Sequence, residues 1–300
     1  MYIRIIIEYE RGEYSTMWKE SLRIGVDTVD KQHKMLFDKV GELIKEVRTN
    51  GTLNKDKCVS TINFLKEYAI SHFADEETYQ KSIDYIDFDA HKKLHERFIQ
   101  TVLDYEKKII ASDFAVAEIK QFVGMLGAWL LYHVADADQR YINETTDQAQ
   151  VGVAYSDFVL FSMSDALEKM ANFSATSIKK VNSHDENCSE GFTVKIGLTG
   201  NAVGHITITY PLSFTKTLIN AMMGFTPEYI GELERSALFE VTNIVSGSIC
   251  RQITTAKGFL CNIKPPVAVD RTMLPSDEQI TIDTGAGIVE TIMAVSFLGN

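Results

Sequence analysis

The sequence predicts two domains of different class: an all-α up-down four-helix bundle, followed by an α+β domain. Three observations support this. Apolar residues recur at helical intervals over residues 28–142, whereas several β-branched runs appear after residue 154. All five prolines lie after residue 210, and both tryptophans lie in the first half of the chain. Three hundred residues are also enough for two separate hydrophobic cores.

Composition excludes several function classes. The chain is 45% hydrophobic and 24% charged, as in ordinary globular proteins, and its net charge of −11 disfavours nucleic acid and anionic lipid as partners. No apolar run is long enough to span a bilayer, so we expect no membrane partner. The four cysteines are scattered, which excludes a thiolate zinc site and predicts a reducing, cytoplasmic location.

The N-terminal half divides into an extension and the predicted bundle. Residues 1–16 contain a short apolar stretch interrupted by Glu8 and Glu10, which does not resemble a signal peptide. The bundle is expected over residues 17–143, with short polar connections that make neighbouring helices antiparallel. Its four helices are predicted at residues 29–47, 57–80, 88–109 and 116–142.

The C-terminal half begins after a polar segment, residues 144–153, that lacks an apolar period and is predicted to be a linker. In residues 154–300, helices and strands mix without strict βαβ alternation, which favours an α+β domain. Helices are predicted at 156–172, 213–224 and 234–253, and strands at 192–200, 204–211, 279–284 and 289–299.

Five of the seven histidines fall inside the predicted bundle, at inward phases of its helices, together with two carboxylates. The set is His33, His72, Glu76, His91, His95, His133 and Asp138. Imidazoles suit iron, copper, nickel or zinc, and each carboxylate can bridge two ions. Two six-coordinate ions offer twelve positions: five imidazoles, two bridging carboxylates and one solvent bridge fill eleven and leave one open. Burying these groups without partners would cost several kcal/mol, so a metal centre is the favoured interpretation.

The spacing of these residues resembles the bacterial hemerythrins. The matching motifs are Gln32-His33 at the end of IGVDTVDKQH, H-F-x-x-E-E from His72 to Glu77, H-x-x-x-H from His91 to His95, and H-x-x-x-x-D from His133 to Asp138 with Tyr141 close behind. The histidine-rich set disfavours a ferritin-like site, which is carboxylate-rich.

The resemblance implies a non-haem pair of iron ions, joined by an oxo or hydroxo bridge, that binds O2 reversibly and carries it as peroxide. It implies His72 as a terminal ligand and Glu76 as a bridge. It also implies that Trp129 and Leu130 line an apolar gas pocket that slows loss of the bound ligand. Glu77 is predicted to be a solvated residue on the helix face.

A second group of polar residues lies on one stripe of the helix predicted over residues 234–253. Leu238, Val241, Val245 and Ile249 form its apolar face, and Ser236, Glu240, Asn243 and Gly247 fall on the opposite side. An E-x-x-N pair alone is ordinary, and a solvated helix face would explain it. The order Ser236, Glu240, Asn243 and then Pro265 or Pro266 resembles the signature of the CheX/CheC/FliY chemotaxis phosphatases.

This second resemblance covers about residues 154–300 and implies hydrolysis of the aspartyl phosphate of a CheY-type response regulator. The receiver would supply the aspartate and Mg2+, so the phosphatase mainly positions the attacking water. Asn243 is the candidate water-orienting amide, Glu240 would pair with a receiver lysine, and Gly247 would allow close approach. The chain has one such motif, which resembles CheX, and therefore implies a homodimer formed through the C-terminal domain.

Together the resemblances predict a cytoplasmic signalling protein that links O2 or redox state to chemotaxis. The alternative is a non-enzymatic O2- or iron-binding protein, whose C-terminal domain only dimerises or binds a receiver. Nothing in the sequence shows coupling between the domains, because coupling requires differential effects between two sites.

Overall fold

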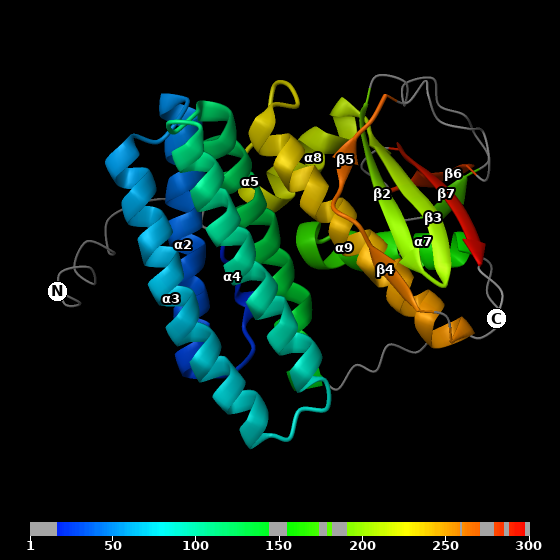
Figure 1. Cartoon of the computed structure of the whole chain (residues 1–300), viewed down its shortest axis with the longest axis horizontal. Coiled ribbons are helices and arrows are strands. Elements are labelled where there is room, and N and C mark those ends of the chain that lie inside the picture. Colours follow the sequence, from blue (N-terminus) through cyan, green and yellow to red (C-terminus); the bar gives the residue numbers. More distant parts are fainter. Residues whose placement is uncertain are drawn as a thin grey trace.

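The computed structural model describes residues 17–143, 155–173, 179–181, 191–258, 260–270, 279–284 and 288–297. The predicted extension, residues 1–16, and the predicted linker, residues 144–153, lie outside the described residues, and the predicted domain boundaries stay predictions. Figure 1 shows a bundle of long helices beside a domain in which helices cover one face of a sheet. This arrangement confirms the predicted class, an all-α bundle followed by an α+β domain.

The bundle is built from amphipathic helices that bury their apolar stripes against one another. A 3-10 turn, η2 (Glu20–Leu22), precedes the long helices. They are α2 (Asp27–Asn50), α3 (Lys55–Ser82), α4 (Phe88–Ala111) and α5 (Val116–Tyr132). Helix α2 ends where Gly51 takes a left-handed conformation, and Asn54 then caps α3 by accepting the Lys57 amide hydrogen at 2.8 Å.

The fourth helix differs from the sequence prediction of one uninterrupted helix over residues 116–142. Helix α5 gives way to a π-helical turn, η3 (His133–Ala137), and the chain continues as α6 (Asp138–Asn143). The Asp138 amide donates to the carbonyl of His133, five residues earlier, which is the hydrogen bond of a π-turn. The wider turn changes the angular relation of the residues at its two ends.

The C-terminal domain packs α7 (Tyr155–Ala171), α8 (Leu212–Met223) and α9 (Glu232–Lys257) with one antiparallel sheet. The strands are β1 (Lys179–Val181), β2 (Phe192–Gly200), β3 (Ala202–Tyr210), β4 (Cys261–Ile263), β5 (Val267–Ala268), β6 (Gln279–Asp283) and β7 (Ile288–Phe297). The sheet order is β1-β6-β7-β3-β2-β4, with β5 also paired to β2. The sequence predicted the four long strands. It missed β1, β4 and β5, which are too short to show a period.

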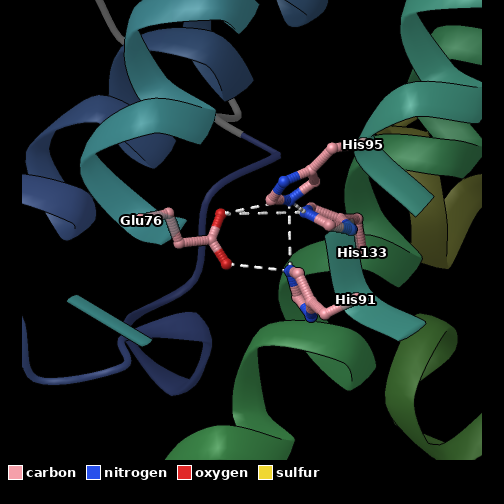
Figure 2. A group of neighbouring side chains, drawn as sticks. All are labelled: Glu76, His91, His95 and His133. Carbon is pink, nitrogen blue, oxygen red and sulfur yellow. Dashed lines mark hydrogen bonds and ion pairs between the residues drawn. The ribbon is translucent and has the colours of Figure 1, made fainter. Parts of the chain in front are cut away.

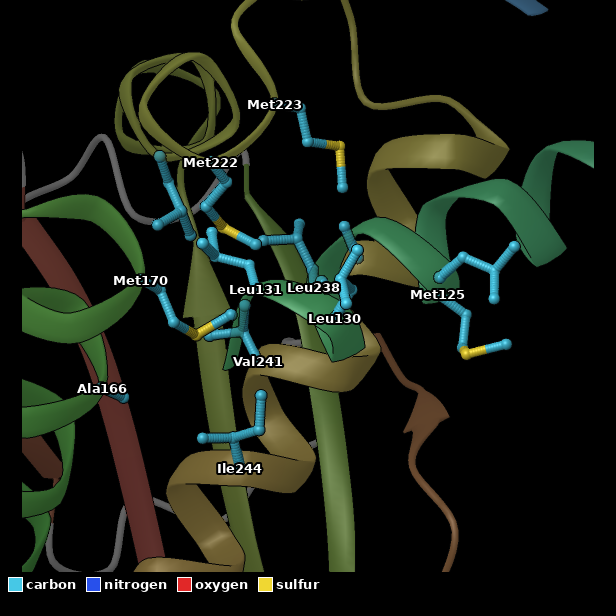
Figure 3. Close-up of a cluster of buried hydrophobic side chains, with 14 of the residues drawn as sticks. Met125, Leu130, Leu131, Ala166, Met170, Met222, Met223, Leu238, Val241 and Ile244 are labelled. Carbon is cyan, nitrogen blue, oxygen red and sulfur yellow. The ribbon is translucent and has the colours of Figure 1, made fainter. Parts of the chain in front are cut away.

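Helix α9 lies between the sheet and the bundle. On one side it contacts β2 and β4, and the Tyr210 hydroxyl of β3 lies 2.9 Å from the Thr242 hydroxyl. On the other side it packs along α5. Figure 3 shows the buried apolar side chains that α5, α7, α8 and α9 share there. One hydrophobic core therefore continues from the bundle into the C-terminal domain.

No helix in the described part of the chain is both long enough and apolar enough to cross a membrane.

Candidate metal centre

Three histidines and one glutamate converge in the centre of the bundle (Figure 2). His91 and His95 come from α4, His133 begins the π-turn, and Glu76 comes from α3. The Nε2 atom of His95 lies 3.1 Å from that of His91 and 3.2 Å from that of His133. Glu76 Oε1 lies 2.9 Å from His91 Nε2. Three ring nitrogens and a carboxylate thus face one point.

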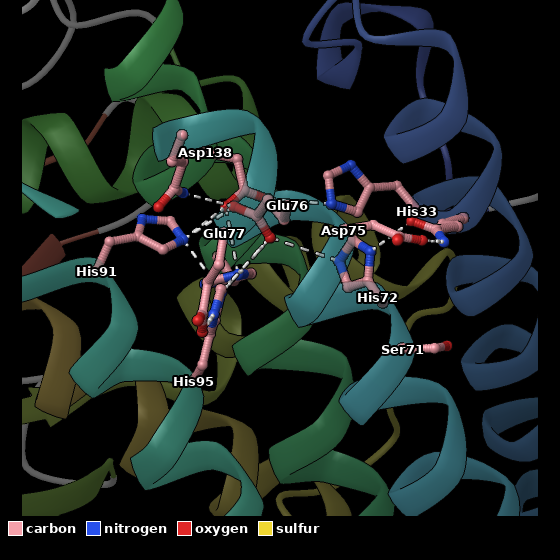
Figure 4. Close-up of polar contacts among 12 residues, drawn as sticks. His33, Ser71, His72, Asp75, Glu76, Glu77, His91, His95 and Asp138 are labelled. Atoms are coloured by element: carbon pink, nitrogen blue, oxygen red, sulfur yellow. Dashed lines mark hydrogen bonds and ion pairs between the residues drawn. The ribbon is translucent and has the colours of Figure 1, made fainter. Parts of the chain in front are cut away.

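A second group, formed by His33, His72 and the same Glu76, lies beside the first (Figure 4). Glu76 Oε2 is 3.7 Å from His72 Nε2. Asp138 also spans both groups: its Oδ2 is 3.2 Å from His33 Nε2, and its Oδ1 is 3.2 Å from His133 Nε2. The two carboxylates are therefore placed between three imidazoles on one side and two on the other, as bridging ligands require.

All seven residues are buried, and several of their polar atoms lack a hydrogen bond. Among the described side chains, these unpartnered atoms include both ring nitrogens of His33, one carboxylate oxygen of Glu76 and both of Asp138. A native core seldom leaves so many polar atoms unsatisfied at one place. Imidazole nitrogens that face one another and two buried carboxylates form a donor set that suits iron. The residues present fit the implied metal.

The protonation of the histidines also suits metal binding. Burial lowers the pKa of His33 to about 4 and that of His72 to about 3, so both rings are neutral near pH 7. His72 Nδ1 lies 3.0 Å from Gln32 Oε1, and His95 Nδ1 lies 3.1 Å from Glu77 Oε1. Since a carbonyl or carboxylate oxygen only accepts, each Nδ1 is the donor. The Nε2 lone pairs are then left for the metal.

The pKa values of the two carboxyl groups are shifted in opposite directions. Burial would raise the pKa of Glu76, but His133, His91 and His95, whose rings face its carboxylate, bring it well below its ordinary value. Burial raises the pKa of Asp138, and the neighbouring Glu76 charge raises it further. A cation between them would favour the charged form of both.

Three residues around the cluster were not predicted as part of it. Glu77 was expected on a solvated face, and this is wrong: its side chain is only 19% exposed and orients the His95 ring. Gln32 does the same for His72, and the Gln80 amide donates to Glu76 Oε1 at 2.9 Å. The i,i+4 spacing of Glu76 and Gln80 was a usable signal. Gln32 and Glu77 belong to the motifs of the hemerythrin resemblance, but their contacts with His72 and His95 cross between helices and were not predicted.

The π-turn explains how His133 and Asp138 reach the same cluster. In a regular α-helix, residues five apart point about 140° away from each other. The five-residue hydrogen bond of the π-turn widens the helix and brings both side chains toward the bundle centre. Interruptions of this kind are frequent at functional sites.

The residues predicted to line a gas pocket lie on α5. The Trp129 ring stacks on His133 with ring centres 4.4 Å apart and on Phe98 at 3.8 Å. Leu130 is buried, and Figure 3 shows it in the apolar cluster between α5 and the C-terminal domain. Phe73, which the sequence interpretation did not include, stacks on His95 at 3.8 Å. Aromatic rings therefore shield the three-histidine side of the cluster from water.

The polar stripe on α9 is intact but not solvated. The Asn243 amide donates to Glu240 Oε2 at 3.2 Å, and both side chains are only partly exposed. Burial raises the pKa of Glu240, and the Asn243 hydrogen bond partly opposes this. Burial also raises the pKa of Tyr105 in α4, where a hydrogen bond with Ser236 opposes the shift and the Glu240 charge adds to it. The stripe thus meets the bundle.

Comparison with known families gives two matches on one chain. Residues 24–144 match the family model described as the hemerythrin HHE cation binding domain. Residues 192–283 match the model described as chemotaxis phosphatase CheX.

Relatives of the bundle include bacteriohemerythrins from several bacteria. The chain is 31% identical over 128 residues to that of Clostridium acetobutylicum, covering 42% of this chain and 98% of the relative. It is 30% identical to that of Pseudomonas aeruginosa over 129 residues, covering 42% of this chain and 79% of the relative. A myohemerythrin of Theromyzon tessulatum is 27% identical over 124 residues, covering 41% and 88% of the two chains.

Solved structures similar to the chain include CheX proteins. In the complex of CheX with CheY, BeF3 and Mg2+ from Borrelia burgdorferi, the similar chain is 20% identical, with a TM-score of 0.40. The similarity covers 48% of this chain and 98% of that one. CheX from Vibrio vulnificus is also 20% identical, with a TM-score of 0.40 and coverage of 47% and 96%.

Proposed function

The chain belongs to the hemerythrin family through its N-terminal bundle, and from this premise we propose that it is an O2-binding, di-iron signalling protein. In this proposal the C-terminal domain dephosphorylates a CheY-type response regulator, in the cytoplasm and as a homodimer. The observation that carries the metal half is the cluster itself, with seven buried donors and several polar atoms left without partners.

The proposed ligand roles follow from the positions of the side chains. His91, His95 and His133 would hold one iron, and His33 and His72 the other. Glu76 and Asp138 would each bind both irons, because each carboxylate contacts imidazoles of both groups. When bound, the two irons supply the electrons and the binding position for O2.

The chain's own residues control that position. The side with two histidines has one donor fewer than the side with three, so a small ligand would find its open position beside His33 and His72. Gln32 keeps the His72 ring in orientation, and Glu77 does so for His95. Trp129 and Phe73 exclude water from the opposite side.

For the C-terminal domain we propose that Asn243 orients a water molecule toward the phosphorus atom of the receiver's aspartyl phosphate. The water oxygen forms a bond to phosphorus, the bond from phosphorus to the aspartate oxygen breaks, and inorganic phosphate leaves with the aspartate restored as a carboxylate. Glu240 would meet the receiver's lysine and fix the register. The Mg2+ would come with the receiver. The match of residues 192–283 to the CheX model supports this assignment.

The test is phosphate release from a phosphorylated CheY-type receiver, measured with the full chain in its oxy, deoxy and oxidised states. We expect release above the receiver's own rate, and a fall of at least about tenfold for Asn243→Ala and Glu240→Ala. If wild type and both variants match receiver alone in every state, the phosphatase assignment fails. A rate that differs between the states would demonstrate coupling and give its sign.

A second candidate function is favoured by one observation: Glu240 and Asn243 are only partly exposed, and Ser236 on the same stripe is buried against α5 of the bundle. On this alternative the C-terminal domain is a non-enzymatic dimerisation or receiver-binding module attached to an O2- or iron-binding bundle. This alternative would be favoured if the chain binds the receiver but releases no phosphate, both when the bundle lies against α9 and when the two are separated.

A further inference from the structure

The bundle covers the start of the α9 face that carries the proposed catalytic residues: Leu233 and Ser236 are buried there, and Glu240 and Asn243 beyond them are partly exposed. Leu233, Ser236, Glu240, Asn243 and Gly247 lie within about 40° of one direction on this helix. The opposite side faces the sheet, where Thr242 meets Tyr210.

Contacts at the start of α9 show how closely the bundle approaches. A Cβ atom placed on Gly124 of α5 would lie 2.1 Å from the Leu233 carbonyl oxygen and 3.2 Å from Ser236 Cβ. Only glycine permits this approach. Beside it, Gln121 donates to Glu232 at 2.8 Å, and Ser236 and Glu240 lie close enough to Tyr105 of α4 to influence its pKa.

Further contacts tie the two domains on either side of this point. Arg48 of α2 lies 4.0 Å above the centre of the Phe225 ring, which follows α8. Asp136 of the π-turn pairs with Lys169 of α7. The interface beside the start of the stripe is thus held from several directions.

The composition of α5 agrees with a helix that is covered on two sides. Every residue from Phe122 to Ala128 is buried, although a helix on the outside of a free bundle would expose one face. One side of α5 carries Trp129 toward the metal cluster, and another carries Gly124 and Gly127 toward α9 and α8. The same helix therefore belongs to both sites.

We propose that the bundle is a cover over the phosphatase face, so that a phosphorylated receiver reaches Glu240 and Asn243 only after α5 has moved away from α9. This inference rests on the proposed phosphatase function and adds its regulation. A folded receiver domain that docks along this stripe would collide with α5 where α5 meets Leu233 and Ser236. The closed arrangement described here is then an inhibited state, and release of α5 is the activating step.

The first experiment opens the cover by substitution. Gly124→Leu would place a side chain against the Leu233 backbone, and Gly41→Leu in α2 is its matched control, because a Cβ there meets nothing within 4 Å. Opening is measured without activity, through the rate at which a thiol reagent labels Ser236→Cys, a position that is 4% exposed in the closed state. We expect at least about tenfold faster labelling and phosphate release with Gly124→Leu, and neither change with Gly41→Leu.

The second experiment closes the cover and does not depend on the stability of the Gly124 variant. Cysteines replace Gln121 and Glu232, whose side chains touch across the interface, and a short bismaleimide joins them. We expect the cross-linked protein to lose receiver binding and phosphate release. The two variants that carry only one of these substitutions, treated alike, should keep both receiver binding and phosphate release.

The outcomes separate the cover from the phosphatase function. If the cross-linked protein releases phosphate as fast as its single-cysteine controls, the cover is refuted and the phosphatase function stands. The same holds if Gly124→Leu speeds labelling but leaves release at the wild-type rate. If the opened protein neither binds the receiver nor releases phosphate, the phosphatase function fails, and the cover fails with it.

Discussion

The metal cluster and the α9 stripe are both polar groups inside a continuous apolar core, but they satisfy their polar atoms differently. In the cluster, His33, Glu76 and Asp138 keep atoms without hydrogen bonds. On the stripe, Glu240 accepts from Asn243, and Ser236 is buried beside Gly124 of the bundle. The cluster is therefore complementary to something absent from the chain, whereas the stripe is complementary to the chain's own bundle. The metal cluster is expected to gain its missing partners when metal binds, and the stripe is expected to become accessible when the bundle moves away from α9.

The largest expected effect, and the strongest test of this comparison, is loss of iron from a variant of the metal cluster. Glu76→Gln removes one of the two carboxylates that both histidine groups share, so iron content should fall from about two ions per chain to below one. Metal analysis after anaerobic reconstitution with ferrous iron measures it, together with the visible band that bleaches on deoxygenation. Glu67→Gln, exposed on the same helix, should keep full iron. Full iron in Glu76→Gln would show that the cluster is not the site.

Lowering the pH should have a smaller effect, on the free energy of unfolding of the metal-free protein. Burial lowers the pKa of His33 to about 4 in the folded state, against about 6.5 in the unfolded chain. Between these values the unfolded chain binds more protons, so the free energy of unfolding falls as pH falls from 6.5 to 4. The loss is about 3 kcal/mol for this histidine. Urea unfolding at pH 7 and pH 5 should show a smaller loss for His33→Gln; equal losses would contradict the prediction.

The smallest effect on the free energy of unfolding is expected for the stripe, and its pH dependence has the opposite sign to that of His33. Burial raises the pKa of Glu240, so the folded state binds the proton more strongly and stability falls as pH rises through the shifted pKa. Glu240→Gln removes this cost and should raise the free energy of unfolding at pH 7 by less than about 1 kcal/mol. It should also abolish phosphate release.

The control for that substitution is Glu234→Gln on the same helix. Glu234 accepts the Gly231 amide hydrogen in the capping box at the start of α9, so its loss should destabilise by roughly 0.5–1 kcal/mol. Equal shifts in the two variants, measured by denaturant unfolding, would show that Glu240 is an ordinary surface carboxylate.

Several features of the site could be predicted because they depend on local spacing. His72 with Glu76, and His91 with His95, are four residues apart and must share a helix face wherever the helix lies. The stripe with Glu240 and Asn243 follows from the same periodicity. The predicted ligand and catalytic roles of these residues stay predictions that the experiments above test.

Contacts between distant segments could not be predicted in this way. Periodicity placed Glu77 on the outer face of its helix, but the packing of α4 against α3 brings His95 to it. The i,i+5 spacing of His133 and Asp138 disagrees with a regular helix, and the π-turn that reconciles them is stabilised by the surrounding bundle.

By itself, the sequence determined the class of each domain and which polar residues share a helix face, because both depend on intervals of a few residues along one element. Only the tertiary structure decided that the start of the α9 stripe, at Leu233 and Ser236, lies against α5. An all-round apolar helix such as α5 must be covered on every side, but its composition does not say by what. That choice depends on Gly124 meeting the backbone of Leu233, more than a hundred residues away in the chain.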